Sequence, residues 1–228
     1  MKCFTGPEGK ASFLGARGPE LPVIIDVLRA TSTIIVLLSR GAERVIPVED
    51  DAEALKLGAE LGALTIGERQ GRKVQGFHHG NSPSEFLDAD LSGQTVVITT
   101  SNGTRVMVEG GVIASTLNAG AVAGRIRSEP HAYMLASGAP LKSDEDLCCA
   151  LLIEYIAGKI KAGETADSAV RLARETREGR LLLDGIRTSA SGRKLTAFGF
   201  GRDVDLICTA VNTYPIVPVY RDGAIILE

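Results

Sequence analysis

An aspartate and an arginine follow an apolar run near the start of the chain. Val23, Ile24 and Ile25 are residues of the kind that form a buried strand, and Asp26 comes directly after them. An unpaired carboxylate is expensive to bury, so we expect Asp26 in a cleft beside a cation or hydrogen-bond donors. Arg29 adds a planar fork of donors that suits phosphate, sulfonate or carboxylate.

The residues after Arg29 fit the start of a helix. Thr31, Ser32 and Thr33 have side chains that cap helices, and an apolar run follows them. A helix N-terminus leaves N–H groups free to bind an anion. Carboxylate, guanidinium and helix N-terminus lie within eight residues and predict a metal-assisted anion site. A strand–turn–helix with a structural Asp–Arg ion pair accounts for the same residues, and both interpretations stay open.

Two further loops carry groups for the same chemistry. In the first, Glu68 is a hard oxygen ligand suited to Mg²⁺ and Arg69 favours an anion, although a solvated charged turn is the alternative. The second offers hydroxyl and amide donors that can form a nest for phosphate oxygens. A polar helix cap explains one or two of these donors but not all. The groups of the second loop are Ser101, Asn102, Thr104 and the guanidinium of Arg105.

Other polar clusters are less specific. Adjacent histidines such as His78 and His79 point to different sides of an extended chain, so we expect one acid or base here rather than a shared metal site. Asn118 follows a strand-like run and is a candidate N-cap. A capping box explains much of the acidic cluster around Glu145 and Asp146, and one acid remains a candidate metal ligand.

Composition excludes several classes of protein. The formal net charge of the 228 residues is −3 and aromatic residues make up 4%, which argues against a nucleic-acid-binding surface. No apolar run is long enough to span a membrane, and the N-terminus has no apolar signal region, so we expect a cytoplasmic protein. The four cysteines have no C-x-x-C spacing, which argues against zinc.

Strand-like and helix-like runs alternate along the chain. This alternation predicts an α/β fold with a mostly parallel sheet, helices on both faces in three layers, and a helix-rich C-terminal half. Residues 1–228 would form one compact unit, or two lobes with 143–210 as the helical part. An Asp-Gly pair predicts a hairpin between the last two strands. Strands are predicted at 22–26, 44–48, 64–66, 95–99, 112–115, 132–136, 216–220 and 224–227, and helices at 31–40, 51–61, 103–110, 119–127, 145–162 and 165–178.

Six short motifs occur along the chain in the following order: Asp26-Val-Leu-Arg-Ala-Thr-Ser-Thr-Ile, Gly67-Glu-Arg, Gly76-Phe with Gly80-Asn-Ser-Pro83, Thr99-Thr-Ser-Asn-Gly-Thr-Arg105, Asn118-Ala and Glu145-Asp146. Together they resemble the 2-phosphosulfolactate phosphatase family. The resemblance covers the chain from about residue 20 to its end, and it departs from the family pattern at His78 and Asn212, where we expect acidic residues.

The resemblance implies a magnesium-dependent phosphatase that converts 2-phosphosulfolactate to sulfolactate, a step towards coenzyme M. Its partner would be a small phosphorylated anion, and a homodimer is the commonest closed assembly. The alternatives are a haloacid-dehalogenase-type phosphatase with Asp26 as nucleophile and a non-catalytic anion-binding protein. The resulting site comprises Asp26, Arg29 and Asn102 as catalytic residues, Arg69, Asn81, Ser82, Ser101, Thr104, Arg105 and Asn118 for the substrate, and Asp26, Glu68, Glu145 and Asp146 for Mg²⁺.

Overall fold

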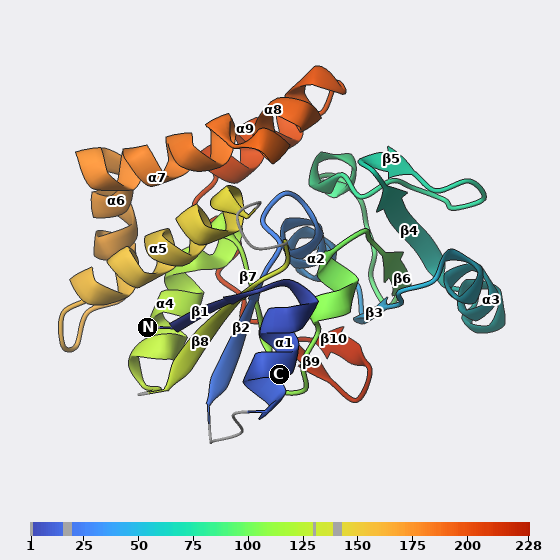
Figure 1. Ribbon diagram of the computed structural model, residues 1–228, viewed down its shortest axis with the longest axis horizontal. Helices are drawn as coiled ribbons and strands as arrows, with labels where there is room; N and C mark the ends of the chain where they lie inside the picture. Colours follow the sequence, from blue (N-terminus) through green and yellow to red (C-terminus); the bar gives the residue numbers. More distant parts are fainter. Residues whose placement is uncertain (1, 16–19, 130, 139–142) are drawn as a thin grey trace.

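Helices cover both faces of one central sheet in the computed structural model of the chain (Figure 1). The structure describes residues 2–15, 20–129, 131–138 and 143–228. The predicted three-layer α/β fold with a mostly parallel sheet is confirmed. In sheet order the strands are β1 (Lys2–Thr5), β8 (Ala132–Ala136), β2 (Leu21–Ile25), β7 (Val112–Ala114), β9 (Val219–Arg221), β10 (Ala224–Ile226), β3 (Arg44–Pro47), β6 (Thr95–Thr99), β4 (Leu64–Arg69) and β5 (Arg72–Lys73).

The sheet consists of two parallel blocks joined by a hairpin. One block contains β1, β8, β2 and β7, and the other contains β3, β6 and β4. The hairpin of β9 and β10 lies between the blocks and pairs antiparallel with β7 on one side and β3 on the other. Because the pairing is antiparallel at three successive steps, the two blocks run in opposite directions along the ladder.

Sheet twist explains how both blocks still contribute to one cavity. Neighbouring strands rotate by roughly 20–25°, so the steps from β2 to β4 accumulate about 120–150°. This rotation offsets most of the reversal at the hairpin. Asp26, directly after β2, therefore lines the same cavity as Glu68 on β4 and Ser101 after β6.

Successive apolar residues of a strand point to opposite faces of the sheet, and each face is covered by its own set of helices. On β2, Val23 and Ile25 pack in the core that contains residues of α4 and α5, whereas Ile24 packs in the core of α2. The helix α3 covers part of the second block, where Ala54 shares a core with Val97 of β6. The helices are α1 (Gly6–Gly15), α2 (Ala30–Ser39), α3 (Asp51–Leu61), α4 (Ala119–Arg127), α5 (Asp144–Lys159), α6 (Asp167–Glu175), α7 (Arg177–Thr188), α8 (Ala190–Ala197) and α9 (Gly201–Thr209).

Burial of β2 and α2 holds the turn between them. Val23, Ile24 and Ile25 are fully buried, and α2 is buried from its first residue to Leu38. Each large apolar side chain contributes about 1.5–3 kcal/mol when it is fully buried. The turn that carries Asp26 and Arg29 is therefore clamped between two strongly buried elements.

Two predicted helices differ from the structure. The helix predicted at 103–110 is wrong: a short 3-10 turn covers Gly103–Val106, and Met107 is already extended with φ −63° and ψ 130°. The helix predicted at 165–178 is interrupted at Thr176, which is extended. Its hydroxyl accepts a hydrogen bond from the backbone N–H of Gly179 at 3.3 Å and so caps α7, as threonine does at helix starts.

The sequence patterns also missed the N-terminal elements and β5. The strand β1 has four residues at the edge of the sheet and β5 has two, which is too short for an alternation pattern. The predicted C-terminal hairpin is confirmed: φ is 50° at Asp222 and 81° at Gly223, and positive φ at both central residues defines the turn that suits a twisted hairpin.

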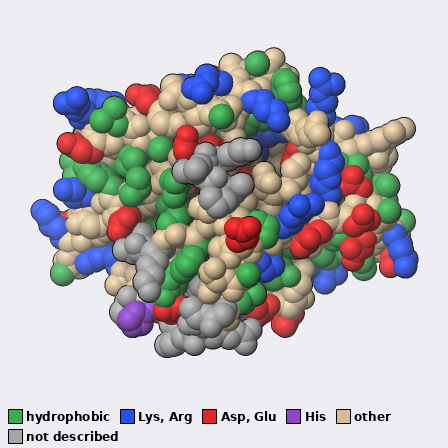
Figure 2. All heavy atoms as spheres, in the orientation of Figure 1, with side chains coloured by type: hydrophobic (Ala, Val, Ile, Leu, Met, Phe, Trp, Pro, Cys, Tyr) green, Lys and Arg blue, Asp and Glu red, His purple; other side chains and the backbone are tan. Residues whose placement is uncertain are grey.

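Two findings concern the molecular surface. Within the described residues, no helix is both long and apolar enough to cross a membrane. On the face shown in Figure 2, Lys and Arg side chains are interspersed with acidic ones, so the described part of that face carries no continuous basic surface.

Candidate active site

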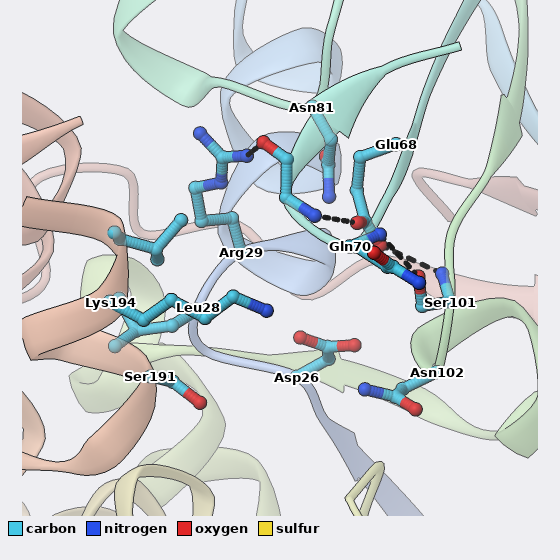
Figure 3. Close-up of a pocket in the computed structure, with 12 residues that line it drawn as sticks. Asp26, Leu28, Arg29, Glu68, Gln70, Asn81, Ser101, Asn102, Ser191 and Lys194 are labelled. Atoms are coloured by element: carbon cyan, nitrogen blue, oxygen red, sulfur yellow. Dashed lines mark hydrogen bonds between the residues drawn. The ribbon is translucent and has the colours of Figure 1, made fainter. Parts of the chain in front are cut away.

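A cavity of about 120 Å³ opens where the carboxyl ends of β2, β4 and β6 meet α8 (Figure 3). It is smaller than the clefts of about 300–1,000 Å³ that bind drug-sized ligands, and so it suits a small organic molecule. Of the residues predicted from the sequence, those that line the cavity are Asp26, Arg29, Glu68, Asn81, Ser101 and Asn102.

Asp26 lies at the buried side of this cavity with 8% of its surface exposed. Its Oδ1 accepts a long hydrogen bond from the backbone N–H of Ala30, at 3.4 Å. Burial raises the pKa of Asp26 from 3.8 to about 6, and the nearby charges of Glu68 and Glu145 act in the same direction. A carboxyl group with a perturbed pKa in a cleft is typical of functional sites.

Gly103 allows the backbone to pass close to Asp26. A Cβ atom at this position would lie 2.6 Å from Oδ2 of Asp26 and 2.7 Å from the Cβ of Ala30. Any other residue would therefore displace the Asp26 carboxylate or the start of α2. The glycine that follows Asn102 therefore has a steric role, which the sequence alone did not indicate.

Glu68 joins the two loops at the other side of the cavity. Its Oε2 accepts a hydrogen bond from the backbone N–H of Gly71 at 2.6 Å, and its Oε1 accepts one from that of Ser101 at 2.8 Å. These bonds hold the loop after β4 against the loop after β6. Each carboxylate oxygen keeps a further lone pair, because a carboxylate has about four acceptor positions.

Asn81 lines the cavity and has a buried, unpaired oxygen. The residue is 3% exposed, its amide nitrogen points toward the cavity (Figure 3), and Oδ1 has no hydrogen-bond partner among the described residues. Leaving a buried acceptor unpaired costs about 1–3 kcal/mol. A rotation of the Asn81 amide would bring this oxygen to a donor or cation bound in the cavity. Asn102 lies on the opposite side, beside Asp26 (Figure 3).

Arg29 is held by three groups. Its Nη1 donates to Oδ2 of Asp203 at 2.8 Å, its Nη2 donates to the carbonyl oxygen of Gly71 at 3.3 Å, and its guanidinium lies 4.2 Å from the ring centre of Phe200. Arg29 therefore forms a buried ion pair, but with Asp203 of α9 and not, as the alternative interpretation of the sequence had it, with Asp26 in the same turn.

Asp203 is a site residue that the sequence reasoning missed. It is fully buried, and Oδ1 also accepts hydrogen bonds from the hydroxyl of Ser82 at 2.7 Å and the backbone N–H of Ser84 at 3.2 Å. A signal was available, because Asp203 shares the buried face of α9 with Val204 and Ile207. A carboxylate on an apolar helix face requires partners.

The helix α8 supplies Leu195 and two polar residues, Ser191 and Lys194, to the cavity. The sequence reasoning missed both polar residues. Nothing in the local pattern separates them from surface residues of a helix, since the contact depends on how α8 packs above the sheet.

Asp146 binds backbone groups at the ends of two strands. Oδ1 accepts a hydrogen bond from the N–H of Val27 at 2.8 Å, and Oδ2 accepts from the N–H of Ser137 at 3.1 Å and from its hydroxyl at 3.2 Å. Burial raises the pKa of Asp146 well above its usual value, and the charge of Asp26 adds to the shift. Glu145 is also buried, with 8% exposed, and its charge acts on Asp26. Their roles as metal ligands stay predictions.

Two of the predicted anion-binding arginines lie away from the cavity. Nη2 of Arg69 is 2.6 Å from Oδ1 of Asp51 and donates to the carbonyl oxygen of Glu49 at 2.8 Å, so this side chain holds the start of α3. The carbonyl oxygen of Arg105 accepts a hydrogen bond from Nζ of Lys10 at 3.2 Å, and its side chain does not line the cavity.

Three other predicted substrate ligands have partners in the protein. Ser82 donates to Asp203, and the hydroxyl of Thr104 donates to the carbonyl oxygen of Thr100 at 3.2 Å. Asn118 is fully buried and bonds to three backbone groups: it completes a capping box with Ser115 and donates to two carbonyl oxygens. Their side chains do not line the described cavity.

The hydroxyl residues at the start of α2 do not act as N-caps, contrary to the prediction. They lie inside the helix, where Arg29 occupies the N-cap position and makes no side-chain cap bond. Their hydroxyls bond back to the preceding turn and so fix its backbone. Thr31 accepts from the N–H of Asp26 at 3.2 Å, Ser32 donates to the carbonyl of Val27 at 2.7 Å, and Thr33 donates to that of Arg29 at 3.1 Å.

The departures from the expected family pattern lie outside the cavity. Nδ1 of His78 is 2.7 Å from the hydroxyl of Thr65, and Asn212 accepts a hydrogen bond from the first turn of α4 at 3.1 Å. His79 lies 3.3 Å from Glu85 on the surface. These contacts explain local structure, and neither histidine lines the cavity among the described residues.

Comparison with known proteins shows to which family the chain is similar. Residues 13–223 match the model of the family described as 2-phosphosulpholactate phosphatase. The chain belongs to this family. Proteins named "Probable 2-phosphosulfolactate phosphatase" from Thermotoga petrophila and Symbiobacterium thermophilum are 37% and 34% identical to it. These alignments cover 90% and 91% of this chain and 91% and 94% of the relatives. The family resemblance found in the sequence is thus confirmed, and the matched region contains every described residue of the cavity.

Proposed function

We propose that the protein is a magnesium-dependent phosphoric monoester hydrolase that converts 2-phosphosulfolactate, or a related phosphorylated hydroxy acid, to the hydroxy acid and phosphate. Family membership and the names of the relatives support the reaction. The observation that carries the proposal to particular residues is that two carboxylates, Asp26 and Glu68, line one small cavity, with Asp26 almost completely buried.

The donor set of the cavity fits Mg²⁺. The described residues contain no group of three or more His, Cys, Asp and Glu side chains arranged to hold a metal. Mg²⁺ commonly uses only one or two carboxylates and keeps several waters, so Asp26 and a remaining lone pair of Glu68 would be sufficient to hold it, and the Asn81 oxygen would join them after rotation of its amide. When bound, the ion would neutralise charge on the phosphoryl oxygens.

The protein side chains have separate tasks in this proposal. Hydrolysis of a phosphomonoester depends mainly on positioning and on charge stabilisation at the phosphoryl oxygens. Arg29, fixed by Asp203, would direct its remaining N–H groups at the substrate, and the amide of Asn102 would donate beside Asp26. The hydroxyl of Ser101 would orient the phosphoryl group from the opposite loop.

Phosphate release tests the reaction and the metal together. The purified protein is treated with chelator and assayed with 2-phosphosulfolactate, 2-phospholactate and phenyl phosphate. We expect no activity after chelation and full recovery with Mg²⁺ or Mn²⁺. Undiminished activity after exhaustive chelation would contradict the metal. Failure to hydrolyse any phosphorylated hydroxy acid in Mg²⁺ would contradict the reaction and favour an anion-binding protein.

The attacking group distinguishes two forms of the proposal. We favour a water molecule, and Asp26 as nucleophile is the haloacid-dehalogenase-type alternative. Rapid acid quenching of turnover, with substrate labelled in its phosphoryl group, would retain label on Asp26 only in the second case.

Three further predictions belong to the same proposal. They are a place in coenzyme M synthesis, a cytoplasmic location and a homodimer.

A further inference from the structure

The acidic side chains of the cavity wall would repel an anionic substrate unless cations offset their charge. Asp26 and Glu68 bring two carboxylates to the wall of the cavity. Arg29 brings a guanidinium, but its charge is matched by Asp203 in an ion pair whose side chains are 2% and 0% exposed. Asp203 therefore offsets part of the attraction that Arg29 offers an anion, and the proposed Mg²⁺ serves the phosphoryl group, so a second acidic group on the substrate requires a further cation.

Lys194 is the remaining cationic side chain of the cavity wall among the described residues. It comes from α8, in the helical part of the chain, and extends towards the cavity from the side opposite Ser101 and Asn102 (Figure 3). Its Nζ lies 5.6 Å from the ring centre of Phe198, a distance at which an aromatic ring attracts an ammonium group. Lys194 has no salt bridge within the described residues.

The two ends of the cavity differ in burial. Asp26 and Asn81 are 8% and 3% exposed, whereas Lys194 is exposed at the mouth. The proposed chemistry occurs at Asp26, so the phosphoryl group occupies the buried end. The rest of the substrate then faces the mouth. There its carboxylate or sulfonate, which takes no part in the reaction, comes within reach of the flexible lysine.

We infer that Lys194 determines substrate specificity by binding the non-reacting carboxylate or sulfonate of the substrate, so that an acidic phosphoester bridges the sheet and α8. This inference rests on the proposed phosphatase function and extends it to a residue outside the predicted motifs. An ammonium group is a compact point charge that pairs with either acid. The preference of the enzyme for acidic phosphoesters is thus located in the helical part.

The test compares substrates that share a phosphoryl group and differ in the second acid. Lys194→Met keeps the length of the side chain and removes its charge, and Lys194→Arg restores a charge. The readout is the ratio of kcat/KM for 2-phosphosulfolactate to kcat/KM for phenyl phosphate. We expect this ratio to fall about tenfold in Lys194→Met, mostly through a higher KM for 2-phosphosulfolactate, because a hydrogen bond to a charged group contributes about this much once the bound substrate covers it. Lys194→Arg should recover most of the ratio.

A matched control removes one lysine charge elsewhere. Lys56 on α3 is exposed and pairs with Glu60 at 3.9 Å, so Lys56→Met should leave the ratio unchanged. An equal loss on both substrates in Lys194→Met would place the lysine on the phosphoryl group and overturn the inference. An unchanged ratio would show a surface lysine that stacks on Phe198 and would overturn it as well.

Direct binding separates this inference from the proposed reaction. Calorimetric titration with sulfolactate, which has both acidic groups and no phosphate, needs no turnover. We expect its Kd to rise about tenfold in Lys194→Met and to stay constant in Lys56→Met. If the wild type binds sulfolactate through Lys194 but hydrolyses no phosphoester, the proposed reaction fails and the binding of the acidic group by Lys194 stands. If the wild type neither binds sulfolactate nor hydrolyses an acidic phosphoester, both fail.

Discussion

Nη1 of Arg29 lies 2.8 Å from Oδ2 of Asp203, and both side chains are almost completely buried. The two residues are far apart in the chain, and the pair joins the turn after β2 to α9. Because Ser82 and Ser84 also donate to Asp203, this carboxylate joins α9 to the turn that carries Arg29 and to the loop that follows Asn81.

Removing Asp203 should therefore destabilise the protein and disturb Arg29. Breaking a buried ion pair by removal of one partner costs about 3–5 kcal/mol, so Asp203→Ala should lower the free energy of unfolding in urea by that amount. The control is Asp205→Ala on the same helix, where the carboxylate pairs with Arg187 at the surface and is 65% exposed. Here the change should stay below about 1 kcal/mol. Equal small effects of both substitutions would show that the buried pair adds no stability.

Asp26→Asn should abolish activity and yet stabilise the metal-free protein at neutral pH. The pKa of Asp26 is about 6 in the folded chain and about 3.8 when unfolded, so ionisation opposes folding as the pH rises through this interval. Two pKa units correspond to about 3 kcal/mol. In chelator, the variant should gain up to this free energy of unfolding at pH 7.5, and the gain should vanish below pH 3.8.

Denaturant titrations of wild type and Asp26→Asn across this pH range measure the difference directly. A variant with wild-type turnover would remove Asp26 from the reaction. A variant whose stability relative to wild type does not depend on pH would show that Asp26 is not buried in its charged form.

Arg29→Lys should lower kcat/KM about ten- to a hundredfold, the effect of a lost hydrogen bond to a charged group. Lysine cannot reach Asp203 and Gly71 together with the planar geometry that Arg29 uses. Arg105→Lys should change kcat/KM less than twofold, since its side chain does not line the cavity. Steady-state assays with 2-phosphosulfolactate compare the two. A comparable loss of kcat/KM in both variants would contradict this expectation and show that both arginines contact the substrate.

Gly103→Ala should impair catalysis more than folding. The added Cβ would approach Oδ2 of Asp26 to 2.6 Å and so displace the carboxylate, and we expect kcat to fall at least tenfold. Gly124 on α4 provides the control, because a Cβ there meets no atom within 4 Å. Gly124→Ala should keep full activity and stabilise the protein by about 0.5–1 kcal/mol, as alanine does in a helix interior. Full activity of Gly103→Ala would show that the loop can move away from Asp26 without displacing its carboxylate.

Local sequence determined much of the fold. The apolar run before Asp26, the helix at 119–127 and the Asp-Gly hairpin were all predicted, because each depends on short-range burial, propensity or turn geometry. The helix predicted at 103–110 was wrong, because Gly103 passes close to Asp26 and the backbone is already extended at Met107. The predictions failed where a long-range contact overrides a local preference.

The sequence by itself determined which chemistry was available: Asp26 at a strand end, donors at Ser101 and Asn102, and a family pattern in which they occur together. Only the tertiary structure decided which groups meet. Sheet twist across the β9–β10 hairpin brings Glu68 to Asp26, and the packing of α8 and α9 contributes Lys194 and Asp203. Such contacts join residues far apart in sequence, and their geometry depends on the whole sheet and its covering helices, which no local pattern encodes.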